Sequence, residues 1–409
     1  MLRRVPQTPR DVTSVLLVMP RWTRDGGVAT HVMASAAALA GHGVDVNVLA
    51  AQIDPAGEAP GVTLIHSPEL FNERATPAER FGEAVAGRPT VIHLHQFEDP
   101  DAVAVMQRHA PVLLSAHGYL ACTSGVHYFR PGQECQRAHG PGCIPSLVAC
   151  AHTSDPRRLP SAFRQAGRSL LTLRRADLAV SYSSAVDRHL ALNEVTRRTV
   201  IPLFSTMSPA VGSGHADRRR VVFAGRVVLP KGVAVLIRAA RAVDAEFVVC
   251  GDGWRREQMQ RLATRMGVHQ RIQFKGWMDS EALARELAEA SVVAVPSIWP
   301  EPFGLVGIEA LAAGRPVVAS AVGGIRDWLE HGVNGLAVKP GDANVLAHAL
   351  QELLADPARQ RAMGLAGREM VARRFSAERH VAALLDAYRS ARANWESARA
   401  GGSRPSFCQ

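Results

Sequence analysis

Apolar residues gather along this chain in short β-branched runs that alternate with longer segments of helical periodicity. In the first half, such runs predict strands at 12–19, 44–49, 90–94, 112–116, 178–181 and 199–201. Helices are predicted between them, for example at 28–40 and 161–175. Short apolar strands separated by helices are typical of a parallel sheet that is covered on both faces. The first half is therefore predicted to be a doubly wound α/β domain.

A second alternating series follows, with strands predicted at 221–224, 246–250, 272–275, 291–295, 317–320 and 335–338. The segment before it is rich in Ser, Pro and Gly, which indicates a linker. The predicted organisation is a domain at 1–205, a linker at 206–217, a second domain at 218–375, a helix at 376–396 that packs back on the first domain, and a flexible tail at 397–409. Two doubly wound domains facing each other would bind ligands between them, at the carboxyl ends of their strands.

Composition limits the classes of partner. The chain has 409 residues, more than a single core usually holds. Its 47 basic and 37 acidic residues give a net charge of +10, which favours anionic partners. Because the arginines are scattered, without a long basic run or finger spacing, nucleic acid is not predicted. No stretch approaches the roughly 18 apolar residues of a membrane-spanning helix. A cytoplasmic protein with charge-mediated contact to the inner membrane surface is expected.

The segment 300–319, PEPFGLVGIEALAAGRPVVA, contains two glutamates that could lie beside one ligand. Glu301 follows a predicted strand, and Glu309 lies on the predicted helix 305–313. Phe303, Gly304 and Leu305 would present free backbone N–H groups at the start of this helix, which stabilise an anion such as a diphosphate. Taken alone, the motif is equally compatible with two solvated acidic helix residues, so both interpretations stay open at this point.

Cations and glycines follow other predicted strands. Arg226 and Lys231 lie in the loop GRVVLPKG, and two fixed cations before a helix suit a departing diphosphate. Gly251 opens a turn, GDG, that permits close backbone approach to a ligand.

In the first domain, the pair Gly26 and Gly27 precedes the first predicted helix. The absence of G-x-G-x-x-G removes the main support for a redox dinucleotide. His117 ends a predicted strand, where the crevice between domains favours a functional role over a structural one.

The second domain resembles the family-4 retaining glycosyltransferases of the GT-B fold. The resemblance rests on GRVVLPKG, GDG, FKGWMD, the E-x7-E segment and AVGGIRDWLEHGVNGLAV within 221–340, and in the first domain on Gly26, Gly27 and His117. It implies two facing Rossmann-like domains and transfer of a sugar from a nucleotide-sugar donor with retention of anomeric configuration. The chain departs from the pattern at Gly118, where aspartate often follows the histidine, and at Asp327, where glutamate is commoner. These departures limit any transfer of acceptor or sugar identity.

The same resemblance implies roles for individual residues. Arg226 and Lys231 would offset the charge of the departing diphosphate, Glu301 would bind hydroxyls of the transferred sugar, and His117 would lie against its ring. Glu309 would bind the ribose. Further donor contacts are expected from Gly26, Gly27, Gly251, Lys275, Ser297, Phe303, Gly304 and Leu305. The implied chemistry is front-face transfer, in which the departing phosphate accepts the acceptor's proton. It requires no cofactor, and no residue is assigned as general base.

Two possible metal sites differ in their support. Cys122, Cys135, Cys143 and Cys150 fall in one loop, 118–155, and in a cytosolic protein such density suggests a structural zinc site rather than disulfides. Since no C-x-x-C pair is present, independent thiols stay the alternative. Asp99 and Asp101 resemble a D-x-D metal motif, but they follow a predicted strand and are predicted to cap a helix.

Several functions remain compatible with these observations. The donor could be a UDP-, GDP- or ADP-sugar. The acceptor could be a lipid-linked saccharide in cell-surface polysaccharide or glycolipid assembly, or a small molecule in a natural-product pathway. A sugar-nucleotide 2-epimerase of the same fold and a non-catalytic scaffold are the alternatives outside transfer, and only the epimerase would convert a donor without an acceptor.

Overall fold

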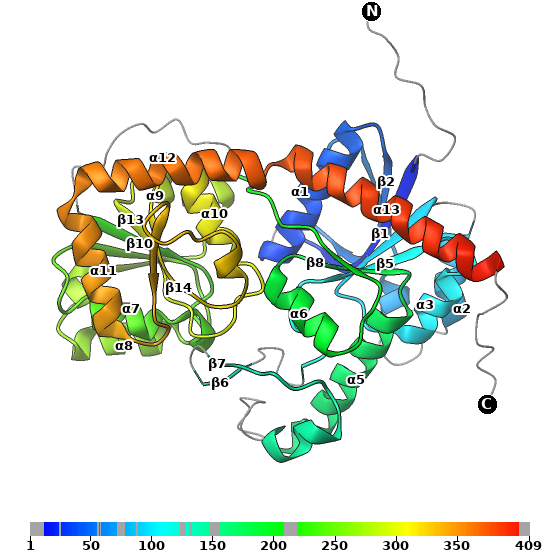
Figure 1. Cartoon of the computed structure of the whole chain (residues 1–409), viewed down its shortest axis with the longest axis horizontal. Coiled ribbons are helices and arrows are strands. Elements are labelled where there is room, and N and C mark those ends of the chain that lie inside the picture. Colours follow the sequence, from blue (N-terminus) through cyan, green and yellow to red (C-terminus); the bar gives the residue numbers. More distant parts are fainter. Residues whose placement is uncertain are drawn as a thin grey trace, which may run out of the picture.

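A computed structural model describes residues 12–400 apart from 24–25, 55–56, 58, 72–77, 87–88, 123–127, 131–132, 148–155 and 208–218. Two α/β domains lie side by side in it (Figure 1). Each is built on one parallel sheet, with seven strands in the first domain and six in the second. The prediction of two doubly wound domains is confirmed.

The first sheet has the order β3-β2-β1-β4-β5-β8-β9. Its strands are β1 (Ser14–Trp22), β2 (Asp45–Ile53), β3 (Val62–His66), β4 (Val91–His95), β5 (Val112–Ala116), β8 (Leu178–Ser181) and β9 (Arg198–Val200). The helices between them are α1 (Gly27–Gly41), α2 (Ala78–Val85), α3 (Pro100–Met106), α5 (Leu159–Arg175) and α6 (Ser184–Leu192).

The sequence prediction missed β3, which pairs with β2 at the edge of the sheet. Its five residues, VTLIH, are all partly or fully exposed. An edge strand without a buried face lacks the apolar run that marked the other strands.

The second sheet has the order β12-β11-β10-β13-β14-β15. Its strands are β10 (Arg220–Ala224), β11 (Glu246–Cys250), β12 (Ile272–Gly276), β13 (Val292–Val295), β14 (Val317–Ser320) and β15 (Gly335–Val338). The helices are α7 (Val233–Ala239), α8 (Arg256–Arg265), α9 (Ser280–Ala288), α10 (Leu305–Ala312) and α11 (Ala343–Ala355), and a short 3-10 helix, η6 (Gly323–Asp327), follows β14.

The strand order reverses between β1 and β4 in the first sheet and between β10 and β13 in the second. Loops on the two sides of such a reversal diverge and leave a crevice at the carboxyl ends of the strands. The segments that follow β1, β10 and β13 are those that carry Gly26, Arg226 and Glu301. The topology thus places the predicted site residues at these switch points.

Two helices close the chain. Helix α12 (Pro357–Arg374) covers the second domain, and α13 (Ala377–Ala400) crosses to the first (Figure 1). Val381, Leu384 and Tyr388 of α13 are buried in the core of the first domain. The helix ends at Ala400, four residues beyond its predicted end at 396.

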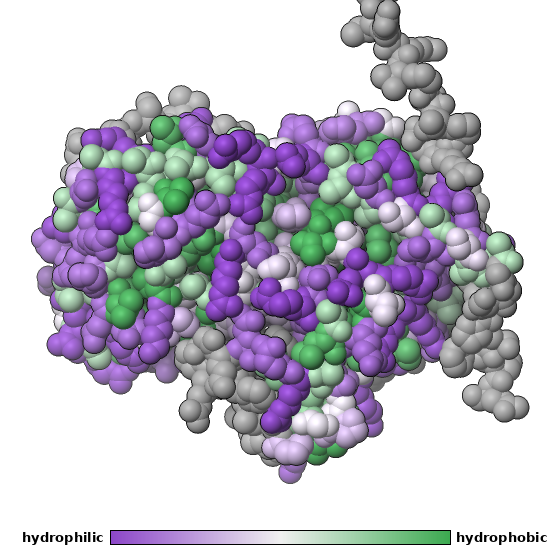
Figure 2. Space-filling view, in the orientation of Figure 1, coloured by the Kyte–Doolittle hydropathy of each residue, from purple (hydrophilic) through white to green (hydrophobic). Residues whose placement is uncertain are grey.

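The surface carries few large apolar side chains. Hydrophilic residues predominate on the face drawn in Figure 2, and apolar ones are scattered over it. Among the exposed exceptions are Trp254 and Trp277, which are 74% and 62% exposed. In the described part of the chain, no helix has the length and apolar character that a membrane span requires.

Candidate functional site

Three glycine-bearing loops of the second domain stack at the carboxyl ends of β10, β11 and β12. The Gly251 N–H donates to the Gly276 carbonyl at 2.7 Å, and the Gly225 N–H donates to the Cys250 carbonyl at 2.9 Å. A β-carbon on Gly251 would overlap the carbonyl oxygen of Gly225. Glycine is therefore required for this approach, and the stacked loops support the segment that carries Arg226.

Lys231 and Glu301 form an ion pair in this site. The Lys231 ammonium donates to both Glu301 carboxylate oxygens, at 2.8 and 2.9 Å. Glu301 is only 3% exposed, and it also accepts from the Ser297 hydroxyl at 2.5 Å. The Lys231 ammonium lies 5.8 Å from the ring centroid of Trp299. The structure thus brings Lys231, Ser297 and Glu301 together, and the ion pair fixes the position of the Lys231 charge.

Glu309 differs from Glu301 in having no side-chain partner within the described residues. It lies on α10, where it is buried, and burial raises the pKa of its carboxyl to about 7. Burial disfavours the charged form of a carboxyl that lacks donors. Hydroxyl groups of a ligand that donate to the carboxylate would favour that form.

The start of α10 is open to an anion. Its N-terminal cap is Gly304, which provides no side-chain hydrogen bond to the first turn. The loop before it is fixed from behind, because the buried Trp328 indole donates to the Phe303 carbonyl at 2.7 Å. Phe303 is buried, and Leu305 is partly exposed. Backbone N–H groups at such a helix start suit a phosphate.

Gly232 ends the loop that carries Lys231 and can be tested directly. Its φ is +72°, and an added β-carbon would overlap the Pro296 carbonyl. We expect Gly232→Ala to cost about 1 to 2 kcal/mol for the backbone and about 1 to 3 kcal/mol for the overlap. Gly267→Ala is the matched control, since its φ is +71° with nothing within 4 Å. Equal losses of unfolding free energy in urea would contradict the close approach at Gly232.

The residues that the sequence singled out in the first domain follow β1 and β5. Gly26 caps α1, and neither Gly26 nor Gly27 has an atom within 4 Å of an added β-carbon. His117 follows β5 and is partly exposed. A β-carbon on the next residue, Gly118, would lie 3.9 Å from Cγ of Pro302, which belongs to the second domain. The segment after β5 of the first domain therefore lies against the segment after β13 of the second.

His117 also ends a buried histidine network. Its Nε2 lies 3.0 Å from Nδ1 of His95, and the ring of His95 packs on that of His93 with centroids 4.2 Å apart. His93 contacts the Tyr388 hydroxyl of α13 at 3.0 Å. Tyr182 stacks on His117 and also contacts His31. Burial lowers the pKa of the histidines in this network, so His117 presents a neutral ring to the cleft.

Two other predicted donor residues have different surroundings. Arg226 is exposed, and its side chain has no partner within the described residues. Lys275 pairs instead with Glu286 of α9, and Glu286 also pairs with Arg220 at 2.6 Å. The Lys275 ammonium is thus engaged at the edge of the sheet, whereas the Arg226 guanidinium is available to a ligand.

Sequence reasoning assigned no function to the contacts that join the two domains. The Asp327 carboxylate accepts from the Ser184 N–H at 2.7 Å and from its hydroxyl at 2.5 Å, at the start of α6. Asp327 was noted only as a departure from the family pattern. Its partner lies 143 positions away, so no local signal could have identified the contact.

The structure bears on the two possible metal sites in different ways. Asp99 caps α3, because its carboxylate accepts from the Asp101 N–H at 2.9 Å and the Ala102 N–H at 3.2 Å, so the predicted cap is confirmed. Cys122, Cys135 and Cys143 are partly buried, and Cys150 lies outside the described residues. Within the described ranges, no three His, Cys, Asp or Glu side chains converge to hold a metal ion. The four-cysteine zinc site stays a prediction.

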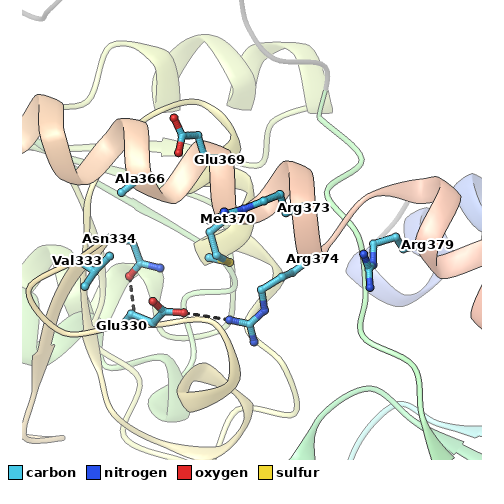
Figure 3. A pocket seen from close by; sticks show the side chains of 9 residues that line it. All are labelled: Glu330, Val333, Asn334, Ala366, Glu369, Met370, Arg373, Arg374 and Arg379. Atoms are coloured by element: carbon cyan, nitrogen blue, oxygen red, sulfur yellow. Dashed lines mark hydrogen bonds and ion pairs between the residues drawn. The ribbon is translucent and has the colours of Figure 1, made fainter.

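A hollow of about 350 Å³ lies at the junction of α12 and α13 (Figure 3). It is lined by Glu330, Val333, Asn334, Ala366, Glu369, Met370, Arg373, Arg374 and Arg379. None of the predicted donor residues lines it, so its arginines are not assigned to the donor diphosphate.

Two family models match the chain. The model described as Glycosyltransferase Family 4 matches residues 25–204, and the one described as Glycosyl transferases group 1 matches residues 211–370. The chain spans less than half of the length of the first curated relatives that it matches. One of these is the lipopolysaccharide core biosynthesis glycosyltransferase LpsE of Rhizobium meliloti, which is 36% identical over 42% of this chain and 49% of its own length.

Other similarities extend over nearly the whole chain. The D-inositol 3-phosphate glycosyltransferase of Paenarthrobacter aurescens is 28% identical over 90% of this chain and 93% of its own length. The structure of the Anabaena protein HepE in complex with UDP and glucose superposes with a TM-score of 0.68. It covers 91% of this chain and 98% of HepE at 20% identity, which supports the same fold.

Proposed function

Because this chain belongs to the family-4 glycosyltransferases of the GT-B fold, we propose that it transfers a sugar from a nucleotide-sugar donor to an acceptor hydroxyl. The observation that carries the proposal is the Lys231–Glu301 pair, set beside the open start of α10. A fixed cation and free backbone N–H groups suit the departing diphosphate. The paired carboxylate offers acceptors to sugar hydroxyls.

In the proposed complex, the diphosphate lies at Gly304 and Leu305. Arg226, which has no partner within the described residues, would add a second positive charge to that of Lys231. Charge of this kind stabilises a leaving group most when it is fixed before the reaction begins. The proposed transfer therefore needs no bound metal or other cofactor.

Glu309 would bind the ribose of the donor. Its carboxyl is buried, and its pKa is raised to about 7 by desolvation. Hydroxyl groups that donate to the carboxylate stabilise the charged form and so lower that pKa. The donor would thus supply hydrogen bonds that the Glu309 carboxylate lacks in the free protein, and these bonds would favour donor binding.

The stereochemical outcome that we propose is retention. The departing phosphate would accept the proton of the acceptor hydroxyl on the same face, while Arg226 and Lys231 offset its charge. His117, with its neutral ring, would contact the sugar opposite Glu301. Analysis of the anomeric configuration of the product by NMR tests this part of the proposal separately.

Nucleotide binding gives a first test. UDP, GDP and ADP are each added at the same high concentration. A nucleotide present at about 100 times its dissociation constant stabilises the folded protein by about 2.7 kcal/mol. At least one should raise the melting temperature of the protein by several degrees, whereas the matched nucleoside should raise it less because it lacks the diphosphate. HepE was crystallised with UDP, so uracil is the first base to try. No shift with any diphosphate would contradict the proposed donor site.

For the acceptor, we propose a lipid-linked saccharide used in cell-surface polysaccharide or glycolipid assembly, at the cytoplasmic face of the membrane. The role of LpsE in lipopolysaccharide core biosynthesis supports this class. The net charge of +10 would favour contact with anionic head groups. Incubation of a bound sugar nucleotide without acceptor separates transfer from epimerisation, because only an epimerase releases a new sugar nucleotide. A scaffold without activity would give neither product.

A further inference from the structure

A pair of short strands from the first domain extends to the donor side of the cleft. Strands β6 (Tyr128–Arg130) and β7 (Gln133–Glu134) pair with each other in a separate two-stranded antiparallel sheet. In Figure 1 they lie below the junction of the two domains. Glu134, at the end of β7, is the residue that contacts the second domain.

The Glu134 carboxylate is held by groups from both domains. Its Oε1 accepts from the Gly323 N–H at 3.2 Å and from Nη1 of Arg326 at 3.2 Å, both in η6 of the second domain. Its Oε2 lies 4.0 Å from Nη2 of Arg188 on α6 of the first domain. The Glu134 side chain is 16% exposed, while the two arginines are half exposed. A carboxylate shielded in this way, at the first N–H of a helical turn, forms charge-assisted hydrogen bonds that solvent weakens little.

Helix η6 is in direct contact with the backbone of Glu301. The Gly324 N–H donates to the Glu301 carbonyl at 2.7 Å. A β-carbon on Gly323, whose φ is +53°, would overlap the Glu301 backbone. Because no space separates the two segments, a shift of η6 moves the backbone that carries the Glu301 carboxylate.

A second carboxylate, from the second domain, accepts hydrogen bonds from the first domain. Asp327, at the end of η6, accepts from Ser184 at the start of α6 in the first domain. The first domain therefore holds η6 at both of its ends, through Glu134 at Gly323 and through Ser184 at Asp327. Two contacts restrain the orientation of η6, whereas one would leave it free to pivot.

We propose that Glu134 is a positioning residue for sugar transfer: it fixes η6, and through it Glu301, in the observed arrangement of the two domains. This inference rests on the proposed function. Glu134 itself touches neither Glu301 nor Lys231 among its described contacts, so it acts on the geometry of the transferred sugar rather than on the diphosphate. The contact also gives a role to β6 and β7, which pair outside the main sheet of the first domain.

The test compares three variants in steady-state transfer. Glu134→Ala should lower kcat about 10- to 100-fold, the loss expected for a misplaced reacting group, and should change the affinity for the nucleoside diphosphate less than about threefold, below the loss of one charge-assisted hydrogen bond. Glu134→Gln should recover part of kcat, because its amide oxygen still accepts from the Gly323 N–H. Glu194→Gln is the matched control, since Glu194 is an 81% exposed carboxylate whose described ion pair is within the first domain.

A measurement that does not depend on turnover keeps this inference separate from the proposed function. Small-angle X-ray scattering should show a larger radius of gyration for Glu134→Ala than for the wild type and Glu194→Gln. If the wild type transfers no sugar, the proposed function fails, and scattering still decides whether Glu134 holds the domains together. If Glu134→Ala does not fold, Arg326→Gln, at a half-exposed side chain, removes the ion pair of Glu134 with η6 from the other domain and leaves the Gly323 N–H in place. Wild-type kcat and wild-type radius in the folded variant would overturn the proposal.

Discussion

Replacing Lys231 with alanine is expected to lower kcat for sugar transfer about 100- to 1,000-fold, the loss typical of one preorganised charge at a developing anion. It should also destabilise the protein by about 1 to 3 kcal/mol, because an uncompensated charge is costly in a buried position. The charge in question is that of Glu301, which is 3% exposed and pairs with Lys231 at 2.8 Å. Steady-state kinetics and urea unfolding of the same preparation measure the two effects.

A double variant separates the two losses. In Lys231→Ala/Glu301→Gln, the unpaired carboxylate is gone, so the unfolding free energy should return towards that of the wild type. The activity should stay low, because the cation for the diphosphate is still missing. Lys339→Ala, at an exposed lysine after β15, is the control for loss of a positive charge elsewhere. Wild-type kcat in the single variant would refute the assignment of Lys231 to the departing diphosphate.

Acidification is expected to destabilise the fold steeply between pH 6.5 and 5. His31, His93, His95 and His380 are at most 4% exposed, and burial lowers their pKa, to about 3 for His93 and about 4 for His380. In the unfolded chain each would titrate near pH 6.5. Below that pH the unfolded state binds more protons, so stability falls as the pH falls, and the loss continues down to the pKa values of the folded state.

The expected size of this effect is large. For each histidine that is neutral in the folded state and protonated in the unfolded state, the free energy of unfolding falls by about 1.4 kcal/mol per pH unit below pH 6.5. The loss is about 2 kcal/mol per histidine at pH 5. Four such residues would remove a large part of the roughly 5 to 15 kcal/mol that stabilises a typical protein. The unfolding free energy, measured in urea at intervals from pH 7.5 to 5, gives the slope directly.

His93→Gln should flatten this pH dependence, because it removes one group that titrates only on unfolding. Glutamine retains polar atoms towards Tyr388 and Ser115, which lie 3.0 and 2.8 Å from the His93 ring nitrogens. His348→Gln, at an exposed position on α11, should keep the wild-type slope. A wild-type unfolding free energy that is constant between pH 7 and 5 would contradict the buried neutral network.

The alternation of apolar strands and helices was enough to predict the two domains. Strands such as β5 and β14 are buried along their whole length, so their sequences are continuous apolar runs. The prediction missed β3, whose half-exposed residues carry no such signal. The helix start at Leu305 was also predictable, because an apolar helix follows directly on Pro and Gly.

The candidate site was predictable as a set of residues but not as a set of contacts. The E-x7-E spacing suggested two similar carboxylates. Glu301 is instead held by Lys231 and Ser297, whereas Glu309 has no side-chain partner among the described residues and a raised pKa. The difference arises from the partners that the fold supplies, since Lys231 lies 70 positions from Glu301.

By itself, then, the sequence determined the two-domain α/β architecture, the strand ends that carry the candidate site residues, and the family to which the chain belongs. Those properties depend on local periodicity and on short motifs, both of which involve residues that are close together in the sequence. Only the tertiary structure decided which charges neutralise each other, which histidines lose contact with water, and how Glu134 and Asp327 join the two domains. The hydrogen bond between Glu134 and Gly323 connects positions 189 residues apart. Its strength depends on burial and distance, which exist only once the chain has folded.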